Sequence, residues 1–167
     1  MNFEQLWAGW RSSYIANAIH ALDHEVECVF CALLDLDDER EAHVLWRADH
    51  AAAILNAYPY TSGHLMIMPL RHVGEMEEIN PEEGFDLMRG ATNAVRALKA
   101  AYAPEGINVG VNIGSAAGAG IPGHFHIHVL PRWRGDTNFM TSIAGIRVMP
   151  ESLDETWKRL KEGWPDT

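Results

Sequence analysis

Apolar residues along the chain follow two kinds of spacing, which predict helices in some segments and short strands in others. They recur at helical intervals over residues 3–19 and 81–102, and Asn80 followed by Pro81 is a good start for the second helix. Shorter apolar runs predict strands over residues 43–47, 51–56, 64–69, 107–113 and 124–131. Residues 152–155 open a short C-terminal helix. Strands on both sides of one long helix favour an α+β fold with a mostly antiparallel sheet.

The composition is that of an ordinary globular protein. The chain has 167 residues, 47% of them apolar and 22% charged, which suits one domain with a core. Two cysteines cannot form the disulfide framework of a small secreted scaffold, and the acidic N-terminus differs from a basic signal peptide. No apolar run approaches the roughly 18–20 residues of a membrane span. We therefore expect a cytoplasmic protein that does not bind membranes.

The distribution of charge is more informative than the net charge of −10, which by itself argues against nucleic acid polymers as partners. Residues 23–41 contain eight carboxylates and residues 75–86 contain six, whereas residues 50–74 and 106–135 contain none. These two carboxylate-free windows hold six histidines and three arginines. Packed together, they would form a neutral-to-positive pocket on an acidic body. Buried core strands would show the same scarcity of carboxylates, so that alternative stays open.

Three histidines alternate with apolar residues in the last predicted strand. Because successive side chains of a strand point to opposite faces, His124, His126 and His128 would form a row about 6.6–6.8 Å apart. Neutral imidazole is both a nucleophile and a hydrogen-bond donor to phosphate near pH 7, although a histidine-rich metal site is a rival interpretation. The preceding segment, residues 114–123, is rich in glycine, which allows backbone N–H groups to approach phosphate oxygens. Together the two features favour attack on a phosphorus centre.

This stretch resembles the histidine triad (HIT) superfamily, whose signature alternates histidines with apolar residues, and HFHIHVL over residues 124–130 fits it throughout. The resemblance extends over about residues 28–149 and includes the segments 55–60, 63–69 and 112–114. The sequence PRWRGDTNF over residues 131–139 looks most like the actinobacterial branch described as diadenosine tetraphosphate phosphorylases. The resemblance implies a single HIT domain over residues 1–167. Its parts would be an N-terminal helical extension (1–27), the core (28–149) and a C-terminal helix and tail (150–167).

The resemblance also implies roles for individual residues. His126 would attack the α-phosphorus and form a nucleotidyl-histidine intermediate, while His128 would hydrogen-bond the phosphoryl oxygens and assist the leaving group. The remaining substrate contacts would come from Asn56 at the ribose and from Asn112, Ser115, Gly118 and Gly120 at the phosphates. Ordinary turn or strand-end hydrogen bonding is the alternative for Asn56 and Asn112. For His64 the alternatives are a supporting role and a plain surface position.

Cys28 and Cys31 have the C-x-x-C spacing of a zinc half-site or a redox pair. Zinc-bearing members of the superfamily add one histidine after the third strand and one from the first triad position, here His72 and His124. The resemblance therefore implies a structural zinc on Cys28, Cys31, His72 and His124. The catalytic work would then fall on His126 and His128. Two buried apolar cysteines beside a surface histidine are the alternative.

The resemblance implies an enzyme that transfers a nucleotidyl group from a dinucleoside polyphosphate to phosphate, so that diadenosine tetraphosphate yields ATP and ADP. A first alternative uses water as acceptor, with a dinucleoside polyphosphate or a nucleoside phosphoramidate as substrate. A second alternative is a non-catalytic nucleotide-binding or metal-binding module. A divalent cation such as magnesium is compatible with the substrate's phosphates. Family members commonly form homodimers through the helix and the sheet edges, and we expect a homo-oligomer here.

Overall fold

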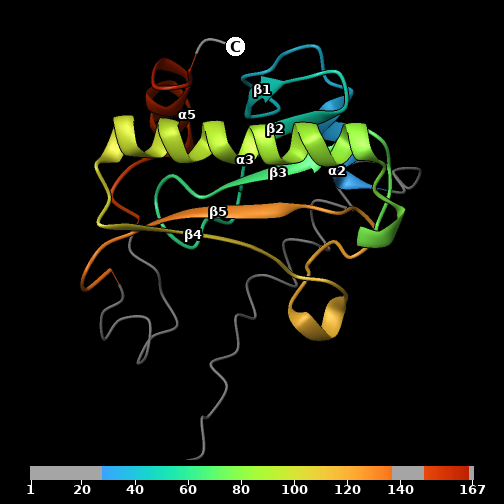
Figure 1. Ribbon diagram of the computed structural model, residues 1–167. Coiled ribbons are helices and arrows are strands. Elements are labelled where there is room, and N and C mark those ends of the chain that lie inside the picture. The colour runs from blue at the N-terminus through green and yellow to red at the C-terminus, as the bar shows by residue number, and fades with distance from the viewer. Residues whose placement is uncertain (1–27, 137–148, 166–167) are drawn as a thin grey trace, which may run out of the picture.

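The computed structural model of the protein describes residues 28–136 and 149–165 (Figure 1). In chain order the elements are α2 (Val29–Leu34), β1 (Val44–Arg47), β2 (Ala51–Leu55), β3 (Leu65–Pro69), the 3₁₀ turn η1 (Met76–Glu78), α3 (Pro81–Tyr102), β4 (Gly106–Val111), the 3₁₀ turn η2 (Ser115–Ala117), β5 (Ile127–Arg132) and α5 (Leu153–Glu162). The expected α+β class is confirmed. No helix in the described ranges is long and apolar enough to cross a membrane. The predicted helix over residues 3–19 lies outside the described residues.

The five strands form one antiparallel sheet in the order β1-β2-β3-β5-β4. The last strand of the chain, β5, therefore lies between β3 and β4, and His128 pairs with Met66 on one side and with Gly110 on the other. This arrangement brings the two carboxylate-free windows together, because β2 and β3 come from one window and β4 and β5 from the other. The two windows therefore lie side by side in one sheet.

Helix α3 covers one face of the sheet (Figure 1). It begins where the sequence predicts, because the Asn80 side chain accepts a hydrogen bond from the Glu83 backbone and the Glu83 carboxylate accepts one from the Asn80 backbone. Its buried side packs on the sheet through a core that includes Leu87, Ala94 and Leu98. A Cβ atom at Gly90 would lie 2.8 Å from Trp46 and 2.9 Å from Ile67, so glycine permits this close approach.

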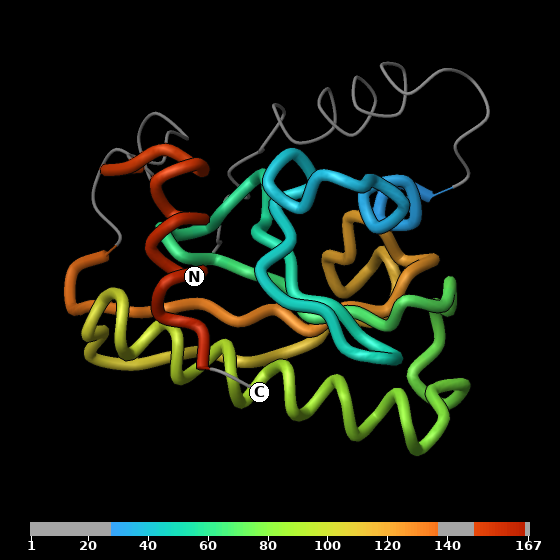
Figure 2. The backbone as a smooth tube through the Cα atoms, turned by 90° about the horizontal axis from the view of Figure 1, so that it is seen from above, coloured from blue at the N-terminus to red at the C-terminus, as the bar shows by residue number. Residues whose placement is uncertain are grey.

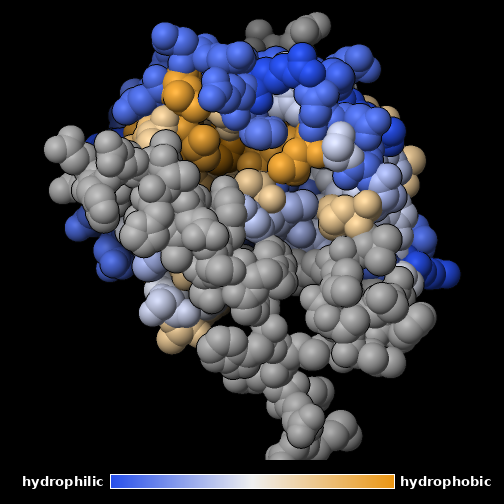
Figure 3. Space-filling model, turned by 180° about the vertical axis from the view of Figure 1, so that it is seen from behind, coloured by the Kyte–Doolittle hydropathy of each residue, from blue (hydrophilic) through white to orange (hydrophobic). Residues whose placement is uncertain are grey.

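The opposite face of the sheet has a second apolar core beneath α2. Figure 2 shows α2 and α3 on opposite sides of the sheet. Phe30 and Leu34 of α2 pack there with Val44, Ile54 and Met66 from the strands. In Figure 3, which shows the side facing away from α3, apolar side chains gather in a hollow bordered by hydrophilic ones. The side chain of His128 belongs to this face, because its neighbours Ile127 and Val129 belong to the core under α3.

Several details differ from the sequence-based expectations. Strand β5 begins at Ile127, not at residue 124. The backbone N–H of Phe125 bonds to the carbonyl of Val73, which lies after the end of β3, and not to a strand of the sheet. Helix α2 was not predicted. Phe85 and Met88 follow the helical periodicity of the α3 core, yet they are 68% and 61% exposed. The C-terminal helix is confirmed as α5, with a capping box at its start.

Candidate active site and metal centre

The ring contacts of the three triad histidines divide them into two groups, which do not follow the boundary of the strand. His124 and His126 lie in the segment before β5, and His128 lies on the strand itself. All three are buried, and the rings of His126 and His128 meet edge to face with their centroids 4.8 Å apart. The ring of His124 instead faces His72, at a centroid distance of 5.4 Å. The structure thus separates His126 and His128, called the catalytic pair below after their predicted role, from a third histidine with other partners.

The hydrogen bonds of His126 determine which ring nitrogen can act as a nucleophile. Its Nδ1 lies 2.8 Å from the backbone carbonyl oxygen of His124, which can only accept, so Nδ1 carries the proton. The neutral ring then keeps its lone pair on Nε2. Burial lowers the pKa of His126, and the hydrogen bond to the carbonyl opposes this effect only in part. The side chain is therefore held as a neutral imidazole with a defined nucleophilic nitrogen.

His128 is held in the complementary form by His64. The backbone N–H of Tyr60 donates to His64 Nδ1 over 3.1 Å, so a neutral His64 carries its proton on Nε2. That nitrogen lies 3.0 Å from His128 Nδ1 and donates to it. The proton of a neutral His128 must then be on Nε2. The catalytic pair thus presents one lone pair, on His126, and one N–H donor, on His128.

The other predicted substrate contacts lie in loops around this pair. Asn56 is buried, its side-chain oxygen accepts a hydrogen bond of 2.9 Å from the Tyr58 backbone, and its Nδ2 lies 3.3 Å from His64 Nδ1, to which it can donate. Asn112 follows the end of β4, and Ser115 begins the exposed turn η2. Gly118 ends η2 with a φ of +95°, a conformation that favours glycine, and the nearby Gly120 is exposed. Their expected contacts with ribose and phosphate stay predictions.

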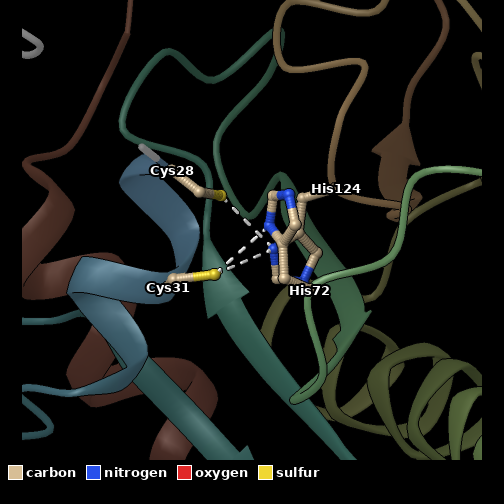
Figure 4. Close-up of side chains that lie close together, drawn as sticks. All are labelled: Cys28, Cys31, His72 and His124. Carbon is tan, nitrogen blue, oxygen red and sulfur yellow. Dashed lines mark hydrogen bonds between the residues drawn. The ribbon is translucent and has the colours of Figure 1, made fainter. Parts of the chain in front are cut away.

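The four predicted metal ligands lie together, with their donor atoms all within 4.8 Å of one another (Figure 4). The Sγ to Nδ1 distances are 3.4 Å for Cys28 and His124, 3.4 Å for Cys31 and His72, and 3.6 Å for Cys31 and His124. In a tetrahedral zinc site, bonds of about 2.3 Å to sulfur and about 2.0–2.1 Å to nitrogen place such ligand atoms about 3.6 Å apart. The donor set and its spacing therefore fit a zinc ion.

Three elements position these ligands. Cys28 and Cys31 lie at the start of α2, and His72 follows β3. His124 is fully buried, and its Nε2 lies 2.9 Å from the carbonyl oxygen of Pro69, to which it donates, so its Nδ1 lone pair points toward the cysteines. Burial and the neighbouring Cys28 raise the pKa of Cys31 to about 11, which disfavours thiolates unless a cation stabilises them.

Two residues of the site were not assigned a specific contact by the sequence. His64 forms the hydrogen bond to His128, and the only signal was a histidine after a glycine at the start of a predicted strand. Phe30, between the two cysteines, places its ring edge to face with His124 at 5.6 Å and with His126 at 5.2 Å. Phe30 thereby connects the metal-ligand cluster with the catalytic pair through packing.

Comparison with known proteins identifies the family of the chain. The HIT domain family model matches residues 37–135. A protein named AP-4-A phosphorylase from Mycobacterium tuberculosis is 39% identical over 165 residues, which cover 96% of this chain and 84% of that protein. The crystal structure of a zinc-bound histidine triad family protein from Mycobacterium smegmatis is similar with a TM-score of 0.66 at 26% identity, covering 82% of this chain and 92% of that one.

A further relative is a bis(5'-nucleosyl)-tetraphosphatase (asymmetrical) from Schizosaccharomyces pombe, 28% identical over 95 residues, which cover 57% of this chain and 52% of that protein. The family model covers more than half of the chain and includes the histidine segment, the catalytic pair and the preceding loop. The protein belongs to the HIT family, whose members include nucleotide-processing enzymes.

Proposed function

We propose that the protein transfers a nucleotidyl group from a dinucleoside polyphosphate to inorganic phosphate, with diadenosine tetraphosphate as substrate. The observation that carries this proposal is the complementary hydrogen bonding of the two histidines, which leaves a lone pair on His126 Nε2 and an N–H donor on His128 Nε2. A nucleophile beside a donor is the arrangement that a displacement at phosphorus requires. The similarity to the mycobacterial AP-4-A phosphorylase over nearly the whole chain supports the choice of substrate.

The reaction has two displacement steps. In the first, His126 Nε2 forms a bond to the α-phosphorus while the bond from that phosphorus to the bridging oxygen breaks, which releases ATP. The N–H of His128 donates to the phosphoryl group and stabilises the charge that develops on its oxygens. In the second step a phosphate oxygen attacks the adenylyl-histidine, the P–N bond breaks, and ADP leaves. We assign the ribose contact to Asn56 and the phosphate contacts to Asn112, Ser115, Gly118 and Gly120.

Incubation with diadenosine tetraphosphate, with and without phosphate, tests the reaction by analysis of its products. We expect ATP and ADP only when phosphate is present. His126→Ala should abolish turnover, whereas His50→Ala, which removes an exposed histidine, should not change it. Equal turnover of His126→Ala and the wild-type protein would contradict the proposal, and so would the lack of any nucleotide product.

Hydrolysis is the second candidate function, which the similarity to the tetraphosphatase of S. pombe favours. Its first step is the same, but water replaces phosphate as the acceptor in the second, so the products are AMP and ATP. The same incubations separate the two candidates, because AMP formed at an equal rate in both buffers would identify a hydrolase. A nucleoside phosphoramidate, tested in parallel, would reveal the other hydrolytic alternative.

We further propose that Cys28, Cys31, His72 and His124 hold a structural zinc ion. When bound, the metal would connect α2 to the segment that carries His126, because the His124 backbone carbonyl accepts the hydrogen bond of His126. Elemental analysis should find one zinc per chain in the wild-type protein and much less in Cys31→Ser. A chelator should lower the melting temperature of the wild-type protein only. Metal-free protein with the wild-type melting temperature would contradict a structural role.

The partners we propose are the nucleotide, with a divalent cation such as magnesium on its phosphates, inorganic phosphate, and a second copy of the chain. Two free cysteines, as a zinc site requires, fit the reducing environment of the cytoplasm, where we place the protein. The exposed apolar residues Phe85 and Met88 of α3 and Val109 of β4 support association between copies.

A further inference from the structure

A cavity of about 1090 Å³ lies beyond the catalytic pair, where β5 and α3 end and α5 begins. These three ends lie on the same side of the molecule in Figure 1. The described residues of its wall include three aromatic side chains, Tyr60, Tyr102 and Trp133. The rings of Tyr102 and Trp133 meet edge to face at a centroid distance of 6.2 Å. The volume is slightly above the usual range for small-molecule sites, which is about 300–1,000 Å³.

The cavity lies next to the catalytic pair, with Tyr60 between them. Tyr60 lines it, and the ring of Tyr60 lies 4.6 Å from His64 and 6.0 Å from His128, measured between centroids. Leu130 and Arg132 also line it, and on β5 they project from the same face as His128 because alternate residues share a face. Arg132 lies four positions after His128 on the strand, a distance of about 13 Å. A group released at His128 would therefore extend along this face into the cavity.

The charged residues of the cavity wall balance one another. Arg132, Arg134 and Arg159 are opposed by Asp136, Glu151 and Glu155, whereas the chain as a whole has a net charge of −10. Two of these arginines are already paired within the wall. Arg132 donates hydrogen bonds to both carboxylate oxygens of Asp136, and Arg159 Nη2 lies 3.4 Å from Glu151 Oε2. Guanidinium groups paired in this way are poor anchors for further phosphates. Aromatic rings with balanced polar groups suit an uncharged ring system that carries hydroxyl groups.

We propose that this cavity binds the nucleoside of the leaving group, that is, the second nucleoside of a dinucleoside polyphosphate. This inference rests on the proposed function, because it assigns the part of the substrate that departs when His126 is nucleotidylated. The base would pack against the aromatic rings of the wall, and the ribose would lie beside its polar groups. The phosphates would stay at the histidines and at the glycine-rich loop. The cavity would thus let the protein distinguish a dinucleoside polyphosphate from a mononucleotide with the same number of phosphates.

The comparison of diadenosine tetraphosphate with adenosine 5'-tetraphosphate tests this assignment, because the two substrates differ only in the second nucleoside. The measured quantity is the ratio of their kcat/KM values. In Trp133→Ala we expect this ratio to fall roughly 5- to 150-fold, the range for loss of a ring on which a base stacks. Trp133→Phe keeps an aromatic ring and should retain most of the ratio. A ratio that is the same in wild type and in Trp133→Ala, at an unchanged melting temperature, would overturn the proposal.

Binding to the His126→Ala variant tests the cavity without the chemistry. Calorimetry should show tighter binding of diadenosine tetraphosphate than of adenosine 5'-tetraphosphate, and the additional Trp133→Ala substitution should remove the difference. Equal affinity for both ligands in His126→Ala would overturn the cavity assignment even if nucleotidyl transfer is observed. If tighter binding of the dinucleotide persists while the wild-type protein forms no products, the proposed reaction fails and the cavity assignment is supported. The two failures are therefore distinguishable.

Discussion

At the scale of single residues, the position of one proton connects His64 to the chemistry. His64 does not reach the reacting phosphorus in our assignment, but it accepts from the Tyr60 backbone and donates to His128. Without this donor, His128 can adopt the other neutral tautomer and lose the N–H that faces the substrate. His64 is therefore a positioning residue, comparable to the hydrogen-bond partners that fix the tautomers of metal-bound histidines.

We predict that His64→Ala lowers kcat about 10- to 100-fold and changes KM little, because substrate contacts remain while the donor is lost in the transition state. Steady-state kinetics with diadenosine tetraphosphate measures the effects on kcat and on KM separately. His64→Gln, whose amide can still donate to His128, should recover part of the loss. His50→Ala is the matched control at an exposed histidine. A rise in KM at constant kcat would assign His64 to substrate binding.

At the scale of elements, the start of α3 also holds the segment that carries a metal ligand. Glu83 is buried, and its carboxylate accepts hydrogen bonds of 2.7 Å from Arg71 Nε and 2.9 Å from Arg71 Nη2. The same carboxylate accepts from the Asn80 backbone. Arg71 directly precedes His72, so one acidic side chain caps the helix and fixes the loop beside the proposed zinc ligands.

We predict that Glu83→Gln destabilises the protein by about 1–3 kcal/mol at pH 7, since charge-assisted hydrogen bonds are lost at a buried position. The hydrogen bond from Arg71 lowers the pKa of Glu83 despite burial. A lowered pKa means that the carboxylate stabilises the fold above the ordinary carboxyl pKa of about 4.3 and that this stability is lost as the pH falls below it. Urea unfolding at pH 7 and below pH 4 should show a smaller difference between variant and wild type in acid. Glu82→Gln, at an exposed neighbour, should have little effect.

The elements that the sequence predicts well are those with local signals. Asn80, Pro81 and Glu83 define the start of α3 within four residues, and the capping box forms as the residue types require. The start of β5 could not be predicted in this way, because Phe125 bonds to Val73, a partner about fifty residues away. Helical spacing likewise could not reveal that Phe85 and Met88 are exposed, since periodicity does not distinguish a core from a surface.

The candidate site shows the same limit. The alternation of histidines and apolar residues correctly placed Phe125, Ile127 and Val129 in the core. The four metal ligands came from resemblance to a family, because Cys28 and His124 are separated by 96 residues and no local spacing connects them. The tautomers of the catalytic pair depend on backbone groups whose positions only the folded chain defines.

At the scale of the whole molecule, the exposed apolar residues favour the proposed association between copies of the chain. Phe85, Met88, Val109 and Ile113 are between 48% and 68% exposed. Within the described residues, β4 is an edge strand, paired only with β5, so its outer backbone groups are available to another strand. A two-fold axis beside β4 would bring together the same surface from two copies.

We predict a homodimer in solution, which Val109→Asp converts to monomers because a charge would be buried at the interface. Light scattering coupled to size exclusion measures the mass directly. Leu36→Asp is the control, since Leu36 is also exposed, at 38%, but lies on the loop after α2. A wild-type protein that is monomeric at micromolar concentration would contradict the interface.

The position of β5 between β3 and β4 has a consequence for the order of events during synthesis. The ribosome releases β1, β2, β3, α3 and β4 before it releases the strand that must be inserted among them. Until then, β3 and β4 have no direct pairing with each other, and both present open edges. The sheet closes only when residues 127–132 arrive, and the same event delivers His126 and His128 to the surface they share with His64. A nascent chain is therefore catalytically silent until its sheet is complete.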